Sequence, residues 1–291
     1  MKIKKTALAV TDICAVALFV YLLAFPKIAA EPTRQALEFC FNTLIPALFV
    51  YMVLAKTVVS LPVTDKLTRI LGIETFALLI GTLCGCPVGA KNAVSLFESG
   101  RISKRQAEYL CSFTNNAGVS FVVGFVGGEL FGDIRIGIKL LIFQLVSAVV
   151  TAAVMRRIMF KKEKMPPPLP RRTAKTGLKE AISDSATTMI NLCACAVFFM
   201  VAGGAITRIF NLPNFWDSIL KSVLEFSSGC AAAARLGKAS LPIAAFAIGQ
   251  TGLSVAMQVK SVVGNKLSLK PYFMGKGIFC AVMTGLAIFC G

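Results

Sequence analysis

Long apolar runs separated by short polar or basic loops dominate the pattern of this chain. About seven runs are long enough to cross a hydrocarbon core roughly 30 Å thick as helices of about 20 residues. They lie at residues 6–25, 35–60, 107–128, 136–155, 185–208, 241–263 and 272–290. Two further apolar stretches, residues 76–90 and 220–236, are shorter or richer in small residues. The pattern predicts an all-α polytopic membrane protein with about seven transmembrane helices and two re-entrant hairpin segments.

Composition and charge support a membrane protein. The 291 residues are 56% hydrophobic and only 15% charged, which lies outside the range of soluble domains. The formal net charge of +17 comes from basic residues in the loops between apolar runs, so it indicates membrane orientation and no nucleic acid binding. The chain has no histidine, which makes zinc-dependent hydrolysis an unfavoured function.

The ten cysteines lie mostly inside apolar runs, where reduced thiols act as small packing residues. A soft-metal site at Cys84 and Cys86 or at Cys193 and Cys195 is the less favoured alternative. We expect no cofactor.

The stretch from Gly81 to Gly128 is apolar enough to enter a bilayer but carries residues that interrupt helices. Irregular backbone at membrane depth is tolerated only where it is buried in protein or lines a wet cavity. The stretch therefore predicts a substrate site, whose candidate residues are Gly85, Pro87, Gly89, Lys91, Asn92, Asn115, Asn116 and Ser120. The four-residue spacing of Gly81, Gly85 and Gly89 also fits close helix packing, although Pro87 argues against one unbroken helix.

A proline-rich basic linker at residues 159–183 divides the chain into halves. We interpret residues 1–30 as an N-terminal transmembrane helix or signal anchor, residues 31–158 as a first repeat and residues 184–291 as a second. The pattern amide, small residue, glycine, apolar residue, serine occurs at residues 116–120 and again at residues 250–254. Gly85-Cys86 has a counterpart in Gly229-Cys230.

Two local features refine the expected helices. Pro46 removes one backbone hydrogen bond beside Asn42 and predicts a kink in the run 35–60. Ser103 is a predicted N-cap for the helix that follows it.

The distribution of charged loops predicts the topology. If the basic N-terminus is cytoplasmic and both short segments turn back, the loops with Lys66, with Arg101 and with Lys260 to Lys270 lie inside, as does the linker. The loops with Glu129, Asp133 and Asp217 then lie outside, in agreement with the positive-inside rule. This topology makes the two halves inverted repeats, an architecture in which transporters bind substrate near the midplane.

Three motifs carry a resemblance to a known family. They are residues 85–91 (GCPVGAK), residues 112–118 (SFTNNAG), and the C-terminal Gly252-Leu253-Ser254-Val255 with Lys270-Pro271-Tyr272-Phe273. The chain resembles the nucleoside-recognition, or Gate-domain, membrane proteins, and is most similar to the sporulation integral membrane proteins implicated in moving dipicolinate. The resemblance covers nearly all of residues 31–291. It implies a fold similar to the concentrative nucleoside transporter core, with paired re-entrant hairpins.

These observations lead to a functional hypothesis. We expect a multi-pass protein of the bacterial cell membrane that transports a small polar, anionic organic solute, dipicolinate-like or nucleoside-like, by alternating access between inverted repeats, with a link to sporulation. The polar groups of Gln250, Thr251 and Ser254 join Asn115, Asn116 and Ser120 as a solute cradle, or else serve as interhelical hydrogen bonds. Lys91 could pair with a carboxylate or reach the interface, and Glu225 could hold a coupling ion or start a helix.

The alternative is a membrane scaffold that keeps the same fold. No nucleophile and base pair or phosphate loop is visible, so enzymatic activity is not expected. Beyond the lipid bilayer and the solute, homo-oligomers and other membrane proteins stay open as partners.

Overall fold

The computed structural model describes residues 13, 15–61, 68, 70–161 and 177–291. Every regular element in this part of the chain is helical, which confirms the all-α class. Four of its helices are long and apolar enough to cross a membrane, and a fifth span is counted if the bent pair Ala15–Ala24 and Pro26–Leu44 is one span. The expected total of seven transmembrane helices with two re-entrant segments stays a prediction. Most of the linker 159–183 and the start of the run 6–25 lie outside the described residues.

A run of three consecutive helical segments follows Ala15–Ala24, namely α2 (Pro26–Phe39), η1 (Cys40–Leu44) and α3 (Ile45–Ser60). The segment η1 is π-helical and ends at Leu44, two residues before Pro46. Because proline has no N–H and clashes with the carbonyl four residues earlier, a wider turn accommodates it. The irregularity expected beside Asn42 is therefore a π-turn.

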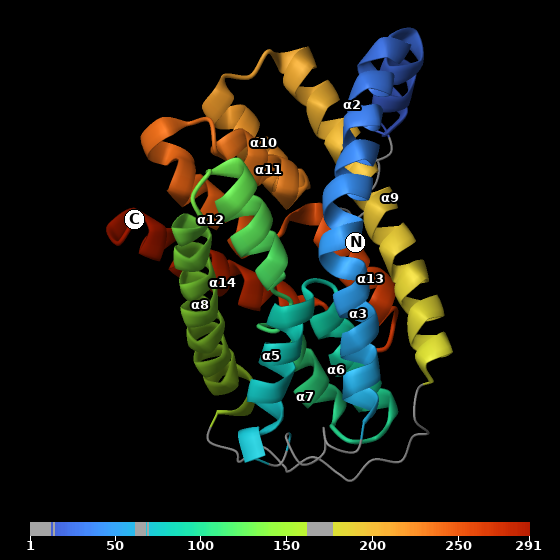
Figure 1. Cartoon of the computed structure of the whole chain (residues 1–291), viewed down its shortest axis with the longest axis vertical. Helices are drawn as coiled ribbons and strands as arrows, with labels where there is room; N and C mark the ends of the chain where they lie inside the picture. Colours follow the sequence, from blue (N-terminus) through green and yellow to red (C-terminus); the bar gives the residue numbers. More distant parts are fainter. Residues whose placement is uncertain (1–12, 14, 62–67, 69, 162–176) are drawn as a thin grey trace.

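Helices α5 (Ile73–Cys84) and α6 (Val88–Glu98) form a hairpin whose turn is Gly85–Pro87. Both arms enter from the same end of the molecule (Figure 1). The expected segment 76–90 is thus one arm and the turn of a longer element. Ser103 directly precedes helix α7 (Lys104–Cys111) and forms a capping box with Gln106, so the predicted N-cap is confirmed.

The expected helix at residues 107–128 is broken in its middle. After α7 the chain is non-helical until the π-helical segment η2 (Ser120–Leu130), and α8 (Ile134–Phe160) then returns along it. Residues 114–118 have no regular structure and are buried. We call residues 112–118 the first break.

The second half has the same order of elements. Helix α9 (Leu178–Phe210) is followed by α10 (Asn214–Leu224) and α11 (Phe226–Ala233), which pack together as a second hairpin with Glu225 at the turn. The short η3 (Gly237–Ala239) leads into α12 (Ser240–Gln250) and α13 (Gly252–Val263), and α14 (Lys270–Phe289) completes the chain. The expected span 241–263 is interrupted at Thr251, whose φ is 62°. We call residues 250–252 the second break.

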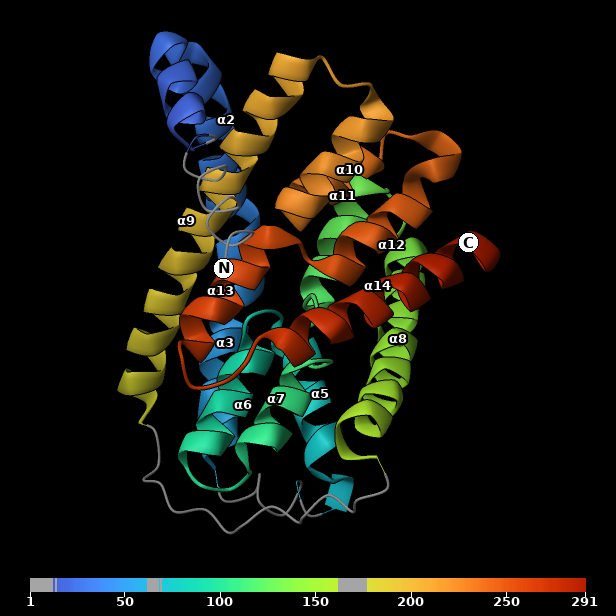
Figure 2. The ribbon, with the colours of Figure 1, turned by 180° about the vertical axis from the view of Figure 1, so that it is seen from behind.

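The two hairpins occupy opposite ends of the molecule (Figures 1 and 2). At the end of the first hairpin, Lys266 of the α13–α14 loop pairs with Glu98, and the Ser268 N–H donates to Glu108. Apolar side chains such as Val149, Ile190 and Phe198 are exposed along the long helices. Such surfaces fit a lipid bilayer, and the chain is a multi-pass membrane protein.

Candidate functional site

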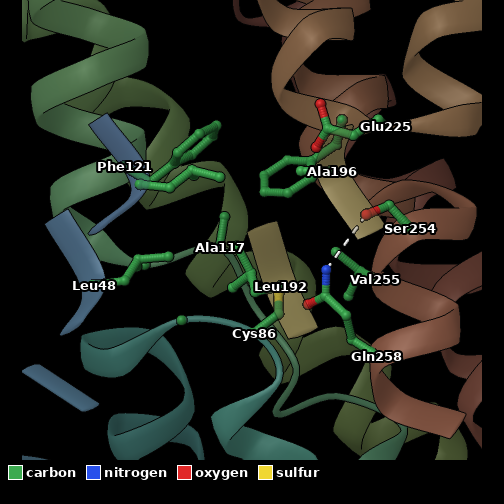
Figure 3. A pocket seen from close by; sticks show the side chains of 14 residues that line it. Leu48, Cys86, Ala117, Phe121, Leu192, Ala196, Glu225, Ser254, Val255 and Gln258 are labelled. Atoms are coloured by element: carbon green, nitrogen blue, oxygen red, sulfur yellow. Dashed lines mark hydrogen bonds between the residues drawn. The ribbon is translucent and has the colours of Figure 1, made fainter. Parts of the chain in front are cut away.

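A small cavity lies where the two hairpin turns meet (Figure 3). Gly85 and Cys86 of the first turn and Glu225 and Phe226 of the second line it from opposite sides. Both broken helices, α9, η1 and α3 complete the wall. The cavity measures about 20 Å³, which is room for about one water molecule.

The side of the cavity formed by α13 is polar. Ser254 and Gln258 lie one turn apart, and the Gln258 Nε2 donates to Ser254 Oγ at 3.3 Å. The Gln258 Oε1 is buried and has no hydrogen-bond partner among the described residues. A buried amide oxygen without a partner costs free energy unless a water or ligand supplies a donor. Gln258 therefore offers an acceptor to whatever occupies the cavity.

Glu225 is the one side chain with a formal charge among the described residues that line the cavity. It is 2% exposed, and its carboxylate accepts from the Ser227 N–H at 3.1 Å and the Ser228 N–H at 2.8 Å. The Ser227 hydroxyl also donates to it. Glu225 thus caps α11, where the positive end of the helix dipole stabilises a negative charge.

The carbonyls of the first break are satisfied by side chains from three other parts of the fold. The Asn115 oxygen accepts from Lys276 Nζ at 2.7 Å, and the Asn116 oxygen from the Cys86 thiol at 2.9 Å. The Ala117 oxygen accepts from Gln144 Nε2 at 3.0 Å. This extended backbone is buried without secondary structure because α14, the first hairpin turn and α8 each supply a donor.

The amides of Asn115 and Asn116 hold the first hairpin against the first break. Asn115 Oδ1 accepts from the Ala90 N–H at 2.8 Å, at the start of α6. Asn116 Nδ2 donates to Thr82 Oγ1 at 3.2 Å, on α5. Neither residue lines the cavity. Their contacts are hydrogen bonds between elements of the fold, the alternative to a solute cradle given in the sequence analysis.

The second break is held to the second hairpin in a similar way. Gln250 Nε2 donates to the Ser222 carbonyl of α10. Gly252 has a φ of 76°, and an added Cβ would lie 3.1 Å from the Leu224 oxygen. Thr251 is fully buried and its hydroxyl donates to the Gln250 carbonyl. Of the candidates in this half, Ser254 and Glu225 line the cavity.

The remaining candidates lie away from the cavity. Lys91 on α6 donates to Thr188 at 3.0 Å and lies 3.5 Å from Asp184, which also pairs with Lys56 at 2.8 Å. Ser120 lines a lateral groove between α3 and α5. Pro87 and Gly89 shape the start of α6, and the buried Asn92 amide has no partner among the described residues. Direct contact of any of these five with a solute stays a prediction.

A larger hollow of about 430 Å³ lies between α2, α9, α10 and α11. Asp217, Lys221 and Arg235 make its lining polar, and its wall includes Ser228, whose N–H binds Glu225. We call it the vestibule. Glu225 is therefore joined to the vestibule through Ser228 and faces the cavity on its other side.

Two residues of the site region are not among the sequence candidates. Gln258 and Lys276 each lie inside an apolar run, one on α13 and one on α14. A polar side chain within a predicted span is expensive unless it has a buried partner or function. That signal is present in the sequence at both positions.

The chain is similar to a sporulation integral membrane protein. The relative is "Sporulation integral membrane protein YlbJ" of Bacillus subtilis (strain 168), which is 23% identical over 322 aligned positions. The match covers 91% of this chain and 79% of the relative. No family model matches the chain. No solved structure matches it either. The chain is therefore a membrane protein related to a sporulation integral membrane protein.

Proposed function

We propose that this protein transports a small polar organic solute by alternating access, with the cavity between the hairpin turns as its binding site. The observation that carries the proposal is the position of the cavity. Both hairpin turns and both broken helices meet there, Glu225 lines the cavity, and Gln258 presents an acceptor that has no partner among the described residues. Discontinuous helices that meet around a buried site are typical of secondary transporters.

The order of elements supports an inverted-repeat architecture. Each half has a long helix, a hairpin, a broken helix and a long helix, and the two hairpins enter from opposite ends. The basic loops with Arg101 and Lys266 share one end, while Asp217 lies at the other. By the positive-inside rule we place the first end, the N-terminus and the linker in the cytoplasm of a bacterial cell.

The cavity in this conformation is too small for an organic solute. A volume of about 20 Å³ holds a water molecule and no organic solute. Transport therefore requires the two hairpin turns to separate, and the vestibule beside Ser228 is the route by which a solute reaches them from the proposed outer side.

The lining also bears on the charge of the solute. Lys91, the expected partner of a carboxylate, is occupied by Asp184 and Thr188 outside the cavity. Glu225 would repel an anion unless it bound a proton. A neutral, nucleoside-like solute with hydrogen-bond donors fits Glu225 and Gln258 better than a dicarboxylate, which would have to enter with a proton. The related protein's name extends the proposal to a role in sporulation.

The first experiment is a ligand screen on the detergent-purified protein. Thermal unfolding is measured with uridine, other nucleosides, dipicolinate and simple dicarboxylates. A solute at 100 times its dissociation constant stabilises the folded state by about 2.7 kcal/mol. We expect Gln258→Leu and Glu225→Gln to abolish the shift and the uptake into proteoliposomes. Asn191→Ala, an exposed amide on α9, is the matched control and should retain both.

The competing function is a membrane scaffold with the same fold. A scaffold predicts no thermal shift with any solute, no uptake, and full function of the cavity variants in the cell. That set of results would remove transport as the function.

A further inference from the structure

Lys276 is a buried lysine within the fold. It lies on α14, is 7% exposed, and donates from Nζ to the Asn115 carbonyl of the first break at 2.7 Å. The ring of Phe279 lies 5.0 Å from the ammonium on the same helix. Among the described residues no carboxylate forms an ion pair with it. A charge buried without a counter-ion is unfavourable, so the surroundings must stabilise it in another way.

The surroundings are the carboxyl ends of half-helices. The ammonium binds the Asn115 carbonyl in the unwound segment that follows α7, and the thiol of Cys86, in the turn that follows α5, donates to the Asn116 carbonyl. Glycine at 275 lets α14 approach the Ser112 carbonyl so closely that an added Cβ would overlap it. Helix carboxyl ends carry partial negative charge. In transporters with broken helices, such ends and the unwound carbonyls hold the coupling cation.

We propose that the Lys276 ammonium is a resident cation that occupies this position in place of a metal ion. A sodium ion at the first break is then unnecessary, and the ammonium holds the break and the first hairpin turn together. The second half shows the complementary arrangement, because the Glu225 carboxylate occupies the amino end of α11. The role of Lys276 in holding the break and the turn together does not depend on the proposed function. The consequence that transport needs no sodium at this position does.

The test removes the ammonium and supplies a substitute. Lys276→Ala deletes a propylammonium group and leaves space for a small cation. We expect propylammonium or sodium, compared with choline at equal ionic strength, to raise the unfolding temperature of this variant and not that of the wild type. Lys276→Met fills the space without a charge and should be destabilised without rescue. Lys270→Ala, an exposed lysine on the same helix, is the control.

A second readout follows the hairpin turn directly. Alkylation of Cys86 by N-ethylmaleimide is quantified by mass spectrometry of the peptide, in membranes and without purification. Losing a charge-assisted hydrogen bond should speed the labelling by roughly 10-fold or more in Lys276→Met. Lys276→Arg, which keeps the charge, should stay protected.

Several outcomes would overturn the proposal. One is Lys276→Met with wild-type stability and a protected Cys86, which would reduce Lys276 to a packing residue. Another is an unstable Lys276→Ala that no cation restores. If neither neutral variant reaches the membrane, an equally defective Lys276→Arg would also count against a cation site. None of these readouts requires a transported solute, so a failed ligand screen leaves them intact.

Discussion

At the scale of single residues, the most demanding contacts surround the Thr114 carbonyl. Gly81 on α5 and Gly89 on α6 face this oxygen from the two arms of the first hairpin, and a Cβ on either would overlap it. Neither glycine has an unusual backbone angle. Glycine is needed at both positions because a side chain would leave no room for the Thr114 carbonyl. The four-residue spacing of these glycines therefore serves both close packing and the formation of the hairpin.

Substituting either glycine should be costly. Gly81→Ala and Gly89→Ala force the first break away from the hairpin, and overpacking of this kind costs about 1 to 3 kcal/mol. Thermal unfolding in detergent measures the loss. Gly124→Ala is the matched control, because an added Cβ there meets nothing within 4 Å. Wild-type stability of both Gly81→Ala and Gly89→Ala would contradict the packing described here.

At the scale of elements, a cluster of ion pairs joins the first hairpin to α9 and α3. Asp184 of α9 pairs with both Lys56 of α3 and Lys91 of α6, and none of the three lines the cavity. Asp184 is about half exposed, so screening by solvent limits the strength of the pairs. The cluster orients the α6 arm without contributing to the cavity lining.

The Lys91 pair gives a prediction that separates its two expected roles. Asp184→Asn should lower stability by under about 1 kcal/mol, with a smaller effect at high salt. Lys91→Met should add little in that background, because its partner is already lost. Proteoliposome uptake by Lys91→Met should remain close to wild type. A large uptake defect at unchanged stability would instead make Lys91 a solute ligand.

Local pattern predicted the elements better than their meeting points. Helix positions follow from apolar runs, and the cap at Ser103 follows from adjacent residues, so both are readable in sequence. The cavity requires turns at Cys86 and Glu225, about 140 positions apart in the chain, to come together. Nothing local identifies Gln258 as a lining residue rather than a packed amide. Gly252, after the Thr251 break, was the missed signal for an interrupted α12–α13 span.

At the scale of the whole molecule, the two polar ends should face different compartments. Glu129 lies at the end of η2 and Asn265 in the α13–α14 loop, and both are exposed. A membrane-impermeant maleimide should label Glu129→Cys in intact cells and Asn265→Cys only after permeabilisation. Both changes are made in a Cys290→Ser background, because Cys290 is an exposed cysteine, and that background alone is the control. Labelling of both from one side would contradict the proposed topology.

Helix α14 belongs to the second half by sequence but is bonded to the first. Lys276 holds the Asn115 carbonyl, Gly275 lies against Ser112, and on the same helix Cys280 packs against Gly249 of α12. If the halves move apart, one of these attachments must yield or α14 must travel with both partners. The parts of the protein that move as units therefore need not coincide with the proposed repeats, and the first half expressed alone would lack the support that α14 supplies.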